Sequence, residues 1–239
     1  RFESRGLGDV YKRQFQNKDD LSIFQKKRIL VKNIPIIIQG SGVLTKKFTE
    51  GKQKKIYDLI FHSRIIKDKG IFEIIDALKI LRNKNINLKA LILGDPDDKN
   101  RSSITLNQLD LWVKENLIIW KSKVKNVIPF LQKSKISILP SYREGLPKGL
   151  LEAASCKLPL ISTNVPGCRE ICKNNFNGFL VKPKDSESLA KSIERLIFDE
   201  RLMKKFGANS RKLVQQKFSA DIVFKNFLGV YREVLKKDP

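Results

Sequence analysis

The sequence predicts an α/β fold, a Rossmann-like parallel sheet with helices on both faces. Short runs such as Tyr57–Phe61 and Ile136–Leu139 are rich in apolar, β-branched residues, as is typical of strands buried in a parallel sheet. Segments with apolar residues at helical spacing, such as Ile71–Leu81, lie between these runs. Strands that alternate with helices indicate βαβ units.

Composition limits the class of protein. The chain has 239 residues, of which 41% are hydrophobic, enough for one large domain or for a domain and part of another. No apolar run approaches the roughly 18 residues of a membrane-spanning helix. Three cysteines make no disulfide framework, and a single histidine leaves a zinc site short of ligands. We therefore expect a cytoplasmic protein.

The net charge of +23 points to an anionic partner. Basic residues are dispersed along the chain rather than clustered with aromatic residues, which argues against nucleic acid. The charge is consistent with peripheral contact at an anionic membrane, where each Lys or Arg contributes about 1 kcal/mol. The alternative is a compositional bias, because Lys, Ile and Asn are all abundant.

The first 14 residues are set apart from the rest. Ser4–Gln14 can be back-translated into a transposon-type sequencing adapter, and it resembles adapter read-through in metagenomic gene models. The alternative is a genuine basic N-terminus. We predict that residues 1–14 are adapter-derived, and we exclude them from the predicted fold.

The next part of the chain contains a short helix and a strand. Asp19 or Asp20 is predicted to cap a helix that runs to about Val31, and Pro35–Ile38 to form a strand. Residues 39–43 then form a Gly-rich joint.

Two cations follow the strand Tyr57–Phe61. Arg64 and Lys69 lie in a loop at its carboxyl end, where two fixed cations would meet a diphosphate. The alternative is that they are two surface charges among 48. His62 is predicted to be a packed or capping residue, with a catalytic role left open.

The strand Leu88–Gly94 ends in a turn that contains two carboxylates. Asp95 and Asp97 have the spacing of a metal-binding pair, but Gly, Pro and Asp are turn formers, and we reject a metal site here. Ser103 is predicted to cap a helix that ends near Glu115. Two further elements are expected before the central stretch, an edge strand at 118–120 and a helix at 127–132.

The stretch from Pro140 to Thr163 organises the rest of the chain. A loop over residues 141–146 follows the strand Ile136–Leu139, Pro147 suits the first turn of a helix, and residues 159–162 form the next strand. Backbone N–H groups of this loop and the N-terminus of the helix together favour an anion such as a diphosphate.

Two glutamates frame this unit. Seven residues separate Glu144 from Glu152, and each carboxylate can accept hydrogen bonds from two adjacent hydroxyls, as a sugar or a ribose offers. The alternative is that both are ordinary solvated glutamates near a helix end.

The last part of the chain is helical. Gly167 at a helix start could approach a ligand closely, and residues 177–181 form a turn and a short strand. Three amphipathic helices follow, with Ser186 and Ser219 as expected caps: 186–198, 201–216 and 220–235.

Three motifs resemble one family of enzymes. The segment from Glu144 to Glu152 resembles the E-x7-E element of retaining glycosyltransferases with the GT-B fold, specifically glycosyltransferase family four. Residues 63–70 are similar to its R-x4-K-G signature, and residues 165–170 to its V-P-G-C-R-E loop. The resemblance covers about residues 15–239.

The resemblance implies roles for the site residues. Glu144 would face the donor sugar and Glu152 the ribose, while Arg64 and Lys69 would bind the phosphates of the donor. The N–H groups of Gly145 and Leu146 would face the diphosphate and the sugar, and no metal or other cofactor would be required.

The resemblance also implies a domain plan and a reaction. Residues 15–42 would be the remnant of a mostly missing N-terminal acceptor domain and its linker, 43–219 the donor-binding domain, and 220–239 a C-terminal helix. The enzyme would transfer a sugar from a nucleoside-diphosphate donor, UDP-linked, with retention. The acceptor would be an undecaprenyl-linked or saccharide precursor of a cell-envelope polysaccharide, at the inner membrane face. The alternatives are a donor-binding fragment without turnover and a GT-B nucleotide-sugar epimerase.

Overall fold

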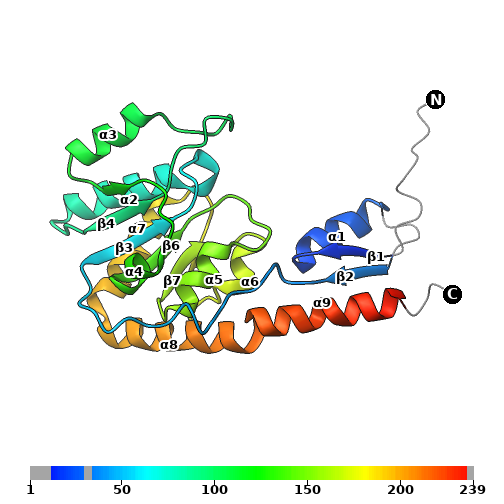
Figure 1. The fold of residues 1–239 in the computed structure, drawn as a ribbon. Helices are drawn as coiled ribbons and strands as arrows, with labels where there is room; N and C mark the ends of the chain where they lie inside the picture. Colours follow the sequence, from blue (N-terminus) through cyan, green and yellow to red (C-terminus); the bar gives the residue numbers. More distant parts are fainter. Residues whose placement is uncertain (1–11, 30–33, 236–239) are drawn as a thin grey trace, which may run out of the picture.

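A computed structural model describes residues 12–29 and 34–235, and its centre is a parallel six-stranded sheet (Figure 1). The strand order is β5-β4-β3-β6-β7-β8. The strands are β3 (Tyr57–His62), β4 (Ala90–Leu93), β5 (Ile119–Lys121), β6 (Ser134–Leu139), β7 (Leu160–Thr163) and β8 (Gly178–Val181). The predicted α/β class and parallel sheet are confirmed.

The central strands are apolar because both faces of the sheet are covered. Leu59, Ile60 and Phe61 of β3 are fully buried, as are Leu91 and Ile92 of β4. The edge strand β5 differs, and its Ile119 is exposed, in agreement with the predicted edge position.

Helices cover both faces of this sheet, and the last of them extends beyond it (Figure 1). They are α2 (Ile71–Asn83), α3 (Leu106–Lys114), α4 (Ile128–Gln132), α5 (Lys148–Ser155), α6 (Cys168–Ile171), α7 (Ser186–Phe198), α8 (Glu200–Lys217) and α9 (Ala220–Leu235), with a short 3-10 turn at Lys67–Lys69. From the middle of the sheet, β3 to β4 and β6 to β7 step in opposite directions, so right-handed crossovers place α2 and α5 on opposite faces. Within the described residues, none of the helices is long and apolar enough to cross a membrane.

One arginine ties the linker to the helices. Arg211 of α8 donates hydrogen bonds to the carbonyls of Thr45 (2.8 Å), Phe48 (2.5 Å) and Ser155 (2.6 Å). The Ser155 hydroxyl also donates to the Phe48 carbonyl, at 2.7 Å. Residues 45–48 are therefore held against α5 and α8 before the chain enters β3.

The N-terminal residues form a small unit of their own, with β1 (Lys12–Phe15), α1 (Lys18–Lys26) and β2 (Ile34–Ile37). The two strands pair in parallel. The predicted strand at 35–38 is thus present, one residue earlier. Lys12–Gln14 were set aside from the predicted fold, but they form part of β1; the adapter origin of residues 1–14 stays a prediction.

The predicted boundaries of α1 were wrong. The helix begins after Asn17, whose Oδ1 accepts a hydrogen bond from the Asp20 N–H at 2.8 Å, so neither aspartate is the cap. The helix ends at Lys26 rather than near Val31, which lies outside the described residues. Asp19 and Asp20 occupy the first turn, where a carboxylate also favours the helix dipole.

Another cap lies two residues from its predicted position. Thr105, not Ser103, caps α3, and its Oγ1 accepts from the Gln108 N–H at 3.2 Å. The Ser103 hydroxyl instead accepts from the Asp97 N–H at 3.0 Å and closes the turn after β4. The sequence pattern alone could not show which of the two hydroxyls caps the helix, because the Ser103 hydroxyl bonds to the turn at Asp97 instead.

Of the two caps predicted for the last helices, one is wrong and one is confirmed. Asp185 rather than Ser186 caps α7, because its Oδ1 accepts from the Ser188 N–H at 2.9 Å. Ser219 is confirmed before α9, where its hydroxyl accepts from the Ile222 N–H at 3.4 Å.

Two helical glycines should respond differently to substitution by alanine. A Cβ at Gly207 of α8 would lie 2.3 Å from the Lys157 carbonyl oxygen, whereas a Cβ at Gly229 of α9 would meet nothing within 4 Å. We expect Gly207→Ala to lower the free energy of unfolding by about 1–3 kcal/mol through overpacking. Gly229→Ala should leave it unchanged or raise it by up to about 1 kcal/mol, through helix propensity. Urea unfolding followed by circular dichroism measures both, and equal effects would contradict the close approach at Gly207.

Candidate functional site

The sheet has a reversal of strand order between β3 and β6. The chain leaves β3 towards β4 and β5, then returns to β6 on the other side of β3. Ligands of open α/β sheets bind outside the carboxyl ends of the strands at such a point. The loops after β3 and β6, residues 63–70 and 140–147, both lie there, and they contain five of the six predicted site residues.

A pocket of about 560 Å³ opens at this edge. The loops after β3 and β4, the segment before α4 and one residue of α5 form its wall. Arg64 and Glu152 lie in the wall together with His62, while Lys69, Glu144, Gly145 and Leu146 do not. The volume falls in the range of small-molecule sites.

Lys69 and Glu144 form an ion pair between the loops that follow β3 and β6. The Lys69 Nζ lies 2.5 Å from Glu144 Oε1, and the side chains are only 14% and 11% exposed. The Ser141 hydroxyl donates to the same carboxylate oxygen at 2.7 Å. The carboxylate is therefore held from two sides, by an ammonium from the β3 loop and a hydroxyl from its own loop.

Ser141 was not predicted as part of the site. It is fully buried, and its carbonyl accepts a hydrogen bond from the Thr163 hydroxyl at the end of β7. The Ser141 hydroxyl also lies 3.2 Å from the Asp68 carbonyl. Its position three residues before Glu144 was the only signal in the sequence, and a buried donor at that spacing cannot be told from a loop serine without the fold.

His62 and Glu152 meet at the end of β3. The His62 Nε2 lies 3.5 Å from Glu152 Oε2, and it is buried with no hydrogen-bond partner among the described residues. A Cβ at Gly149 would lie 3.1 Å from that Nε2 and 3.0 Å from the His62 carbonyl oxygen. His62 is thus packed under the first turn of α5, as predicted, and a side chain at Gly149 would press against it.

Arg64 lies apart from Lys69 and pairs with a carboxylate that was missed. The Arg64 Nη1 lies 2.7 Å from Asp97 Oδ2, and the Arg64 side chain is 59% exposed. Asp97 was interpreted only as a turn residue. The two predicted phosphate-binding cations therefore do not converge on one point in this structure, and each has a carboxylate partner.

Gly167 packs against the loop that contains Gly145. Gly167 has φ +78°, and a Cβ there would lie 2.5 Å from the Gly145 carbonyl oxygen and 2.6 Å from that of Glu144. Gly167 was expected to approach a ligand; the structure shows that it approaches this loop. The loop geometry thus depends on a residue that tolerates positive φ without a side chain.

The N-terminal unit also contacts this loop. The Asn17 Nδ2 donates to the Gly145 carbonyl at 2.9 Å. Two ion pairs flank this contact, Asp19 with Arg169 (2.6 Å) and Asp20 with Arg143 (3.0 Å). These partners are separated by more than 100 residues, and nothing local in the sequence indicated them.

The three cysteines are buried structural residues. Burial raises the pKa of the Cys156 thiol to about 12 and that of the Cys168 thiol to about 11, and it raises the pKa of Cys172 well above its usual range. A protonated thiol is a poor nucleophile and a poor metal ligand. In the described part of the chain no three His, Cys, Asp or Glu side chains cluster as a metal site would require.

The family model described as "Glycosyl transferases group 1" matches residues 43–213. This range contains the switch point, the pocket and the Lys69–Glu144 pair.

Curated relatives share the same region. The chain is 36% identical over 174 residues to the capsular polysaccharide biosynthesis glycosyltransferase CapM of Staphylococcus aureus, covering 73% of this chain and 45% of CapM. It is 25% identical over 227 residues to the N,N'-diacetylbacillosaminyl-diphospho-undecaprenol alpha-1,3-N-acetylgalactosaminyltransferase of Campylobacter jejuni, covering 89% of this chain and 58% of that enzyme. The chain thus spans about half the length of these relatives.

Solved structures show the same fold. The pneumococcal O-GlcNAc transferase GtfA, in complex with UDP and GlcNAc, superposes with a TM-score of 0.81 at 19% identity, over 95% of this chain and 46% of GtfA. Anabaena HepE, in complex with UDP and glucose, gives 0.79 at 16% identity, over 92% of this chain and 62% of HepE. The predicted similarity to one half of a GT-B fold is confirmed.

The thiols should resist alkylation while the chain is folded. Their pKa values are raised, so at pH 8 the neutral form dominates and reaction with iodoacetamide should be slow. We expect no modified cysteine in the native chain and three in urea, counted by mass spectrometry. Rapid modification of Cys168 in the native chain would contradict its burial.

The Lys69–Glu144 pair should appear as an energetic coupling. Lys69→Met leaves a nearly buried carboxylate without its ammonium, and we expect a loss of up to about 3 kcal/mol in the free energy of unfolding. The double variant Lys69→Met with Glu144→Gln should recover part of that loss, because the uncompensated charge is gone. Urea unfolding of the four chains measures the coupling, and additive effects would contradict it.

Proposed function

This chain belongs to the glycosyl transferases group 1 family, and we propose that within such an enzyme it binds a nucleoside-diphosphate sugar donor. The observation that carries the proposal is the pocket at the switch point, with Arg64, His62 and Glu152 in its wall and the Lys69–Glu144 pair at the same edge of the sheet. Solved neighbours named as complexes with UDP support this choice of ligand.

Each polar group has a role in donor binding. The Glu152 carboxylate accepts hydrogen bonds from the ribose diol, and the Glu144 carboxylate accepts from hydroxyls of the donor sugar. Arg64 and Lys69 bind the diphosphate, and the N–H groups of Gly145 and Leu146 face the diphosphate and the sugar. Arg64 is exposed and can turn from Asp97 towards an incoming phosphate.

The proposed reaction is transfer with retention, without a metal ion. The bond between the anomeric carbon and the diphosphate oxygen breaks, and the acceptor oxygen bonds to that carbon from the same face. The acceptor proton passes to the leaving diphosphate. Arg64 and Lys69 stabilise the negative charge that develops on that group, an effect that contributes most where donors are already in place.

We further propose a lipid-linked acceptor in polysaccharide biosynthesis, reached at the cytoplasmic face of the membrane. Two relatives support it by name, the Campylobacter jejuni enzyme and an Escherichia coli galactosyltransferase that acts on GlcNAc-diphosphoundecaprenol and is 26% identical over 81% of this chain. The net charge of +23 is consistent with an anionic membrane nearby. The second candidate is donor binding without turnover by this chain, which spans about half the length of the relatives it matches.

Donor binding should depend on the pocket and not on metal. In calorimetric titration of the chain we expect UDP to bind more tightly than GDP or ADP, with the same affinity in EDTA. Arg64→Ala and Glu152→Ala should each lower the affinity for UDP by about tenfold or more, because each removes a charged hydrogen-bond partner. Arg101→Ala, at an exposed arginine outside the pocket, is the matched control for charge and should leave binding unchanged.

Two outcomes would change the proposal. Preferential binding of GDP would keep the fold and site but replace the donor base. Binding of UDP that survives Arg64→Ala and Glu152→Ala alike would place the nucleotide elsewhere and remove the assigned roles.

A further inference from the structure

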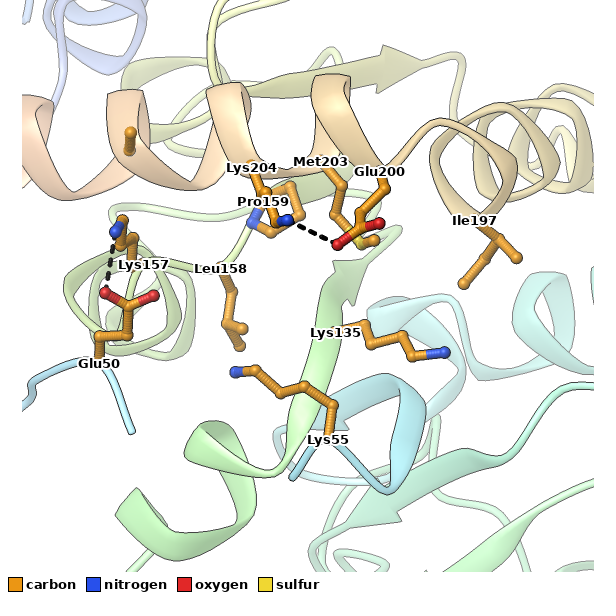
Figure 2. Close-up of a pocket in the computed structure, with 11 residues that line it drawn as sticks. Glu50, Lys55, Lys135, Lys157, Leu158, Pro159, Ile197, Glu200, Met203 and Lys204 are labelled. Atoms are coloured by element: carbon orange, nitrogen blue, oxygen red, sulfur yellow. Dashed lines mark hydrogen bonds and ion pairs between the residues drawn. The ribbon is translucent and has the colours of Figure 1, made fainter. Parts of the chain in front are cut away.

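A second pocket, of about 580 Å³, lies at the opposite edge of the sheet (Figure 2). Lys55 precedes β3, Lys135 lies at the start of β6, and Pro159 precedes β7, so this is the amino edge of the strands. The loop Glu50–Lys55 and helix α8 complete its wall. None of these residues belongs to the three motifs that resemble the family or to the proposed donor site.

The wall has one apolar side, four ammonium groups and two carboxylates, those of Glu50 and Glu200. Leu158 and Pro159 from the turn after α5, Ile197 from α7 and Met203 from α8 supply apolar surface. The ammonium groups come from Lys55, Lys135, Lys157 and Lys204. Such a mixture suits a ligand that is itself part apolar and part anionic.

Three of the four lysines already have a carboxylate partner. Lys135 pairs with Asp58 (2.7 Å), Lys157 with Glu50 (2.8 Å) and Lys204 with Glu200 (2.6 Å). Figure 2 shows the last two of these pairs on the rim of the pocket. Among the described residues, no carboxylate lies within ion-pair distance of Lys55.

Lys55 is therefore the unmatched charge of the pocket. Its Nζ donates one hydrogen bond, to the Gln132 carbonyl at 3.0 Å, and Figure 2 shows the side chain extending into the space beneath Leu158. Lys55 is half-buried, and this burial lowers the pKa of its ammonium, opposed by the nearby charge of Glu50. A desolvated ammonium with donors to spare is stabilised by an anion.

We propose that this pocket binds a small anion with an apolar body, a phosphate monoester or carboxylate on an alkyl chain. The anionic head lies on Lys55, and the apolar body lies against Leu158 and Met203. The volume falls in the range of sites for small organic ligands.

The site is independent of the donor pocket. Lys55 and His62 stand at opposite ends of β3, and the six residues of that strand separate the two edges by roughly 20 Å. A ligand here should therefore bind together with UDP rather than compete with it, and failure of one proposal leaves the other open to test.

The first experiment titrates the full chain with octyl phosphate, below its micelle concentration, by calorimetry. We expect saturable binding that Lys55→Met weakens by about tenfold or more, since the variant keeps the side-chain length and removes the charge. Lys54→Met is the matched control, because it removes the same charge from the exposed neighbouring residue. Saturating UDP should leave octyl phosphate binding unchanged.

A second pair of variants tests the site independently, in case Lys55→Met fails to fold. Ala208 lines the pocket from an exposed position of α8, so Ala208→Glu adds a negative charge to the wall with little effect on folding. We expect Ala208→Glu to lower the affinity for octyl phosphate by a similar factor. Gln215→Glu makes the same change of charge on α8 outside the pocket and should have no effect.

Two further arms identify the source of the anion. Inorganic phosphate should bind more weakly than octyl phosphate, because it lacks the apolar body. Co-sedimentation with phosphatidylcholine vesicles, with and without phosphatidic acid, then separates two sources. Retention that needs both phosphatidic acid and Lys55 assigns a membrane lipid, and octyl phosphate binding without such retention assigns a free phosphate monoester.

Three results would overturn the proposal. One is the absence of saturable octyl phosphate binding to the unchanged chain. Another is octyl phosphate binding by both Lys55→Met and Ala208→Glu that is as tight as binding by the unchanged chain. The third is displacement of octyl phosphate by UDP, which would place it in the donor pocket.

Discussion

The ion pair between Lys69 and Glu144 connects the two halves of the sheet at the point where the strand order reverses. One partner follows β3 and the other follows β6, and Ser141 fixes the carboxylate from the second side. A buried ion pair is weak evidence for stability, because desolvation offsets much of its attraction. Its consequence here is geometric, since it joins the loop after β3, part of which lines the pocket, to the loop after β6.

The elements of the fold could be predicted because their signals are local. Apolar runs mark β3 and β6, and helical spacing marks α2 and α7, within a few residues of the observed ends. Caps were less certain, because a hydroxyl near a helix start has competing partners. Ser103 shows this: its hydroxyl accepts from the turn at Asp97, and the cap is Thr105.

The contacts within the site could not be predicted in the same way. Lys69 and Glu144 are separated by 75 residues, and only the order of the strands brings them together. Arg64 was expected to face the same anion as Lys69, but its long exposed side chain lies against Asp97, a residue that local sequence marks only as a turn former. The contact of Asn17 with the Gly145 carbonyl is likewise a product of the fold.

The cations at the two edges of the sheet have different partners, and this difference affects which ligand each site could select. At the carboxyl edge Arg64 and Lys69 already contact carboxylates, so an incoming diphosphate must offer a better partner than Asp97 or Glu144 does. A doubly charged group meets that condition more readily than a single charge does. At the amino edge no described carboxylate lies within ion-pair distance of Lys55, although the charge of Glu50 in the same wall acts on it. A single negative charge can therefore meet Lys55 directly, and the apolar wall beside it becomes the source of selectivity. The sheet can thus hold two sites of different character, because lysines lie near both ends of its strands.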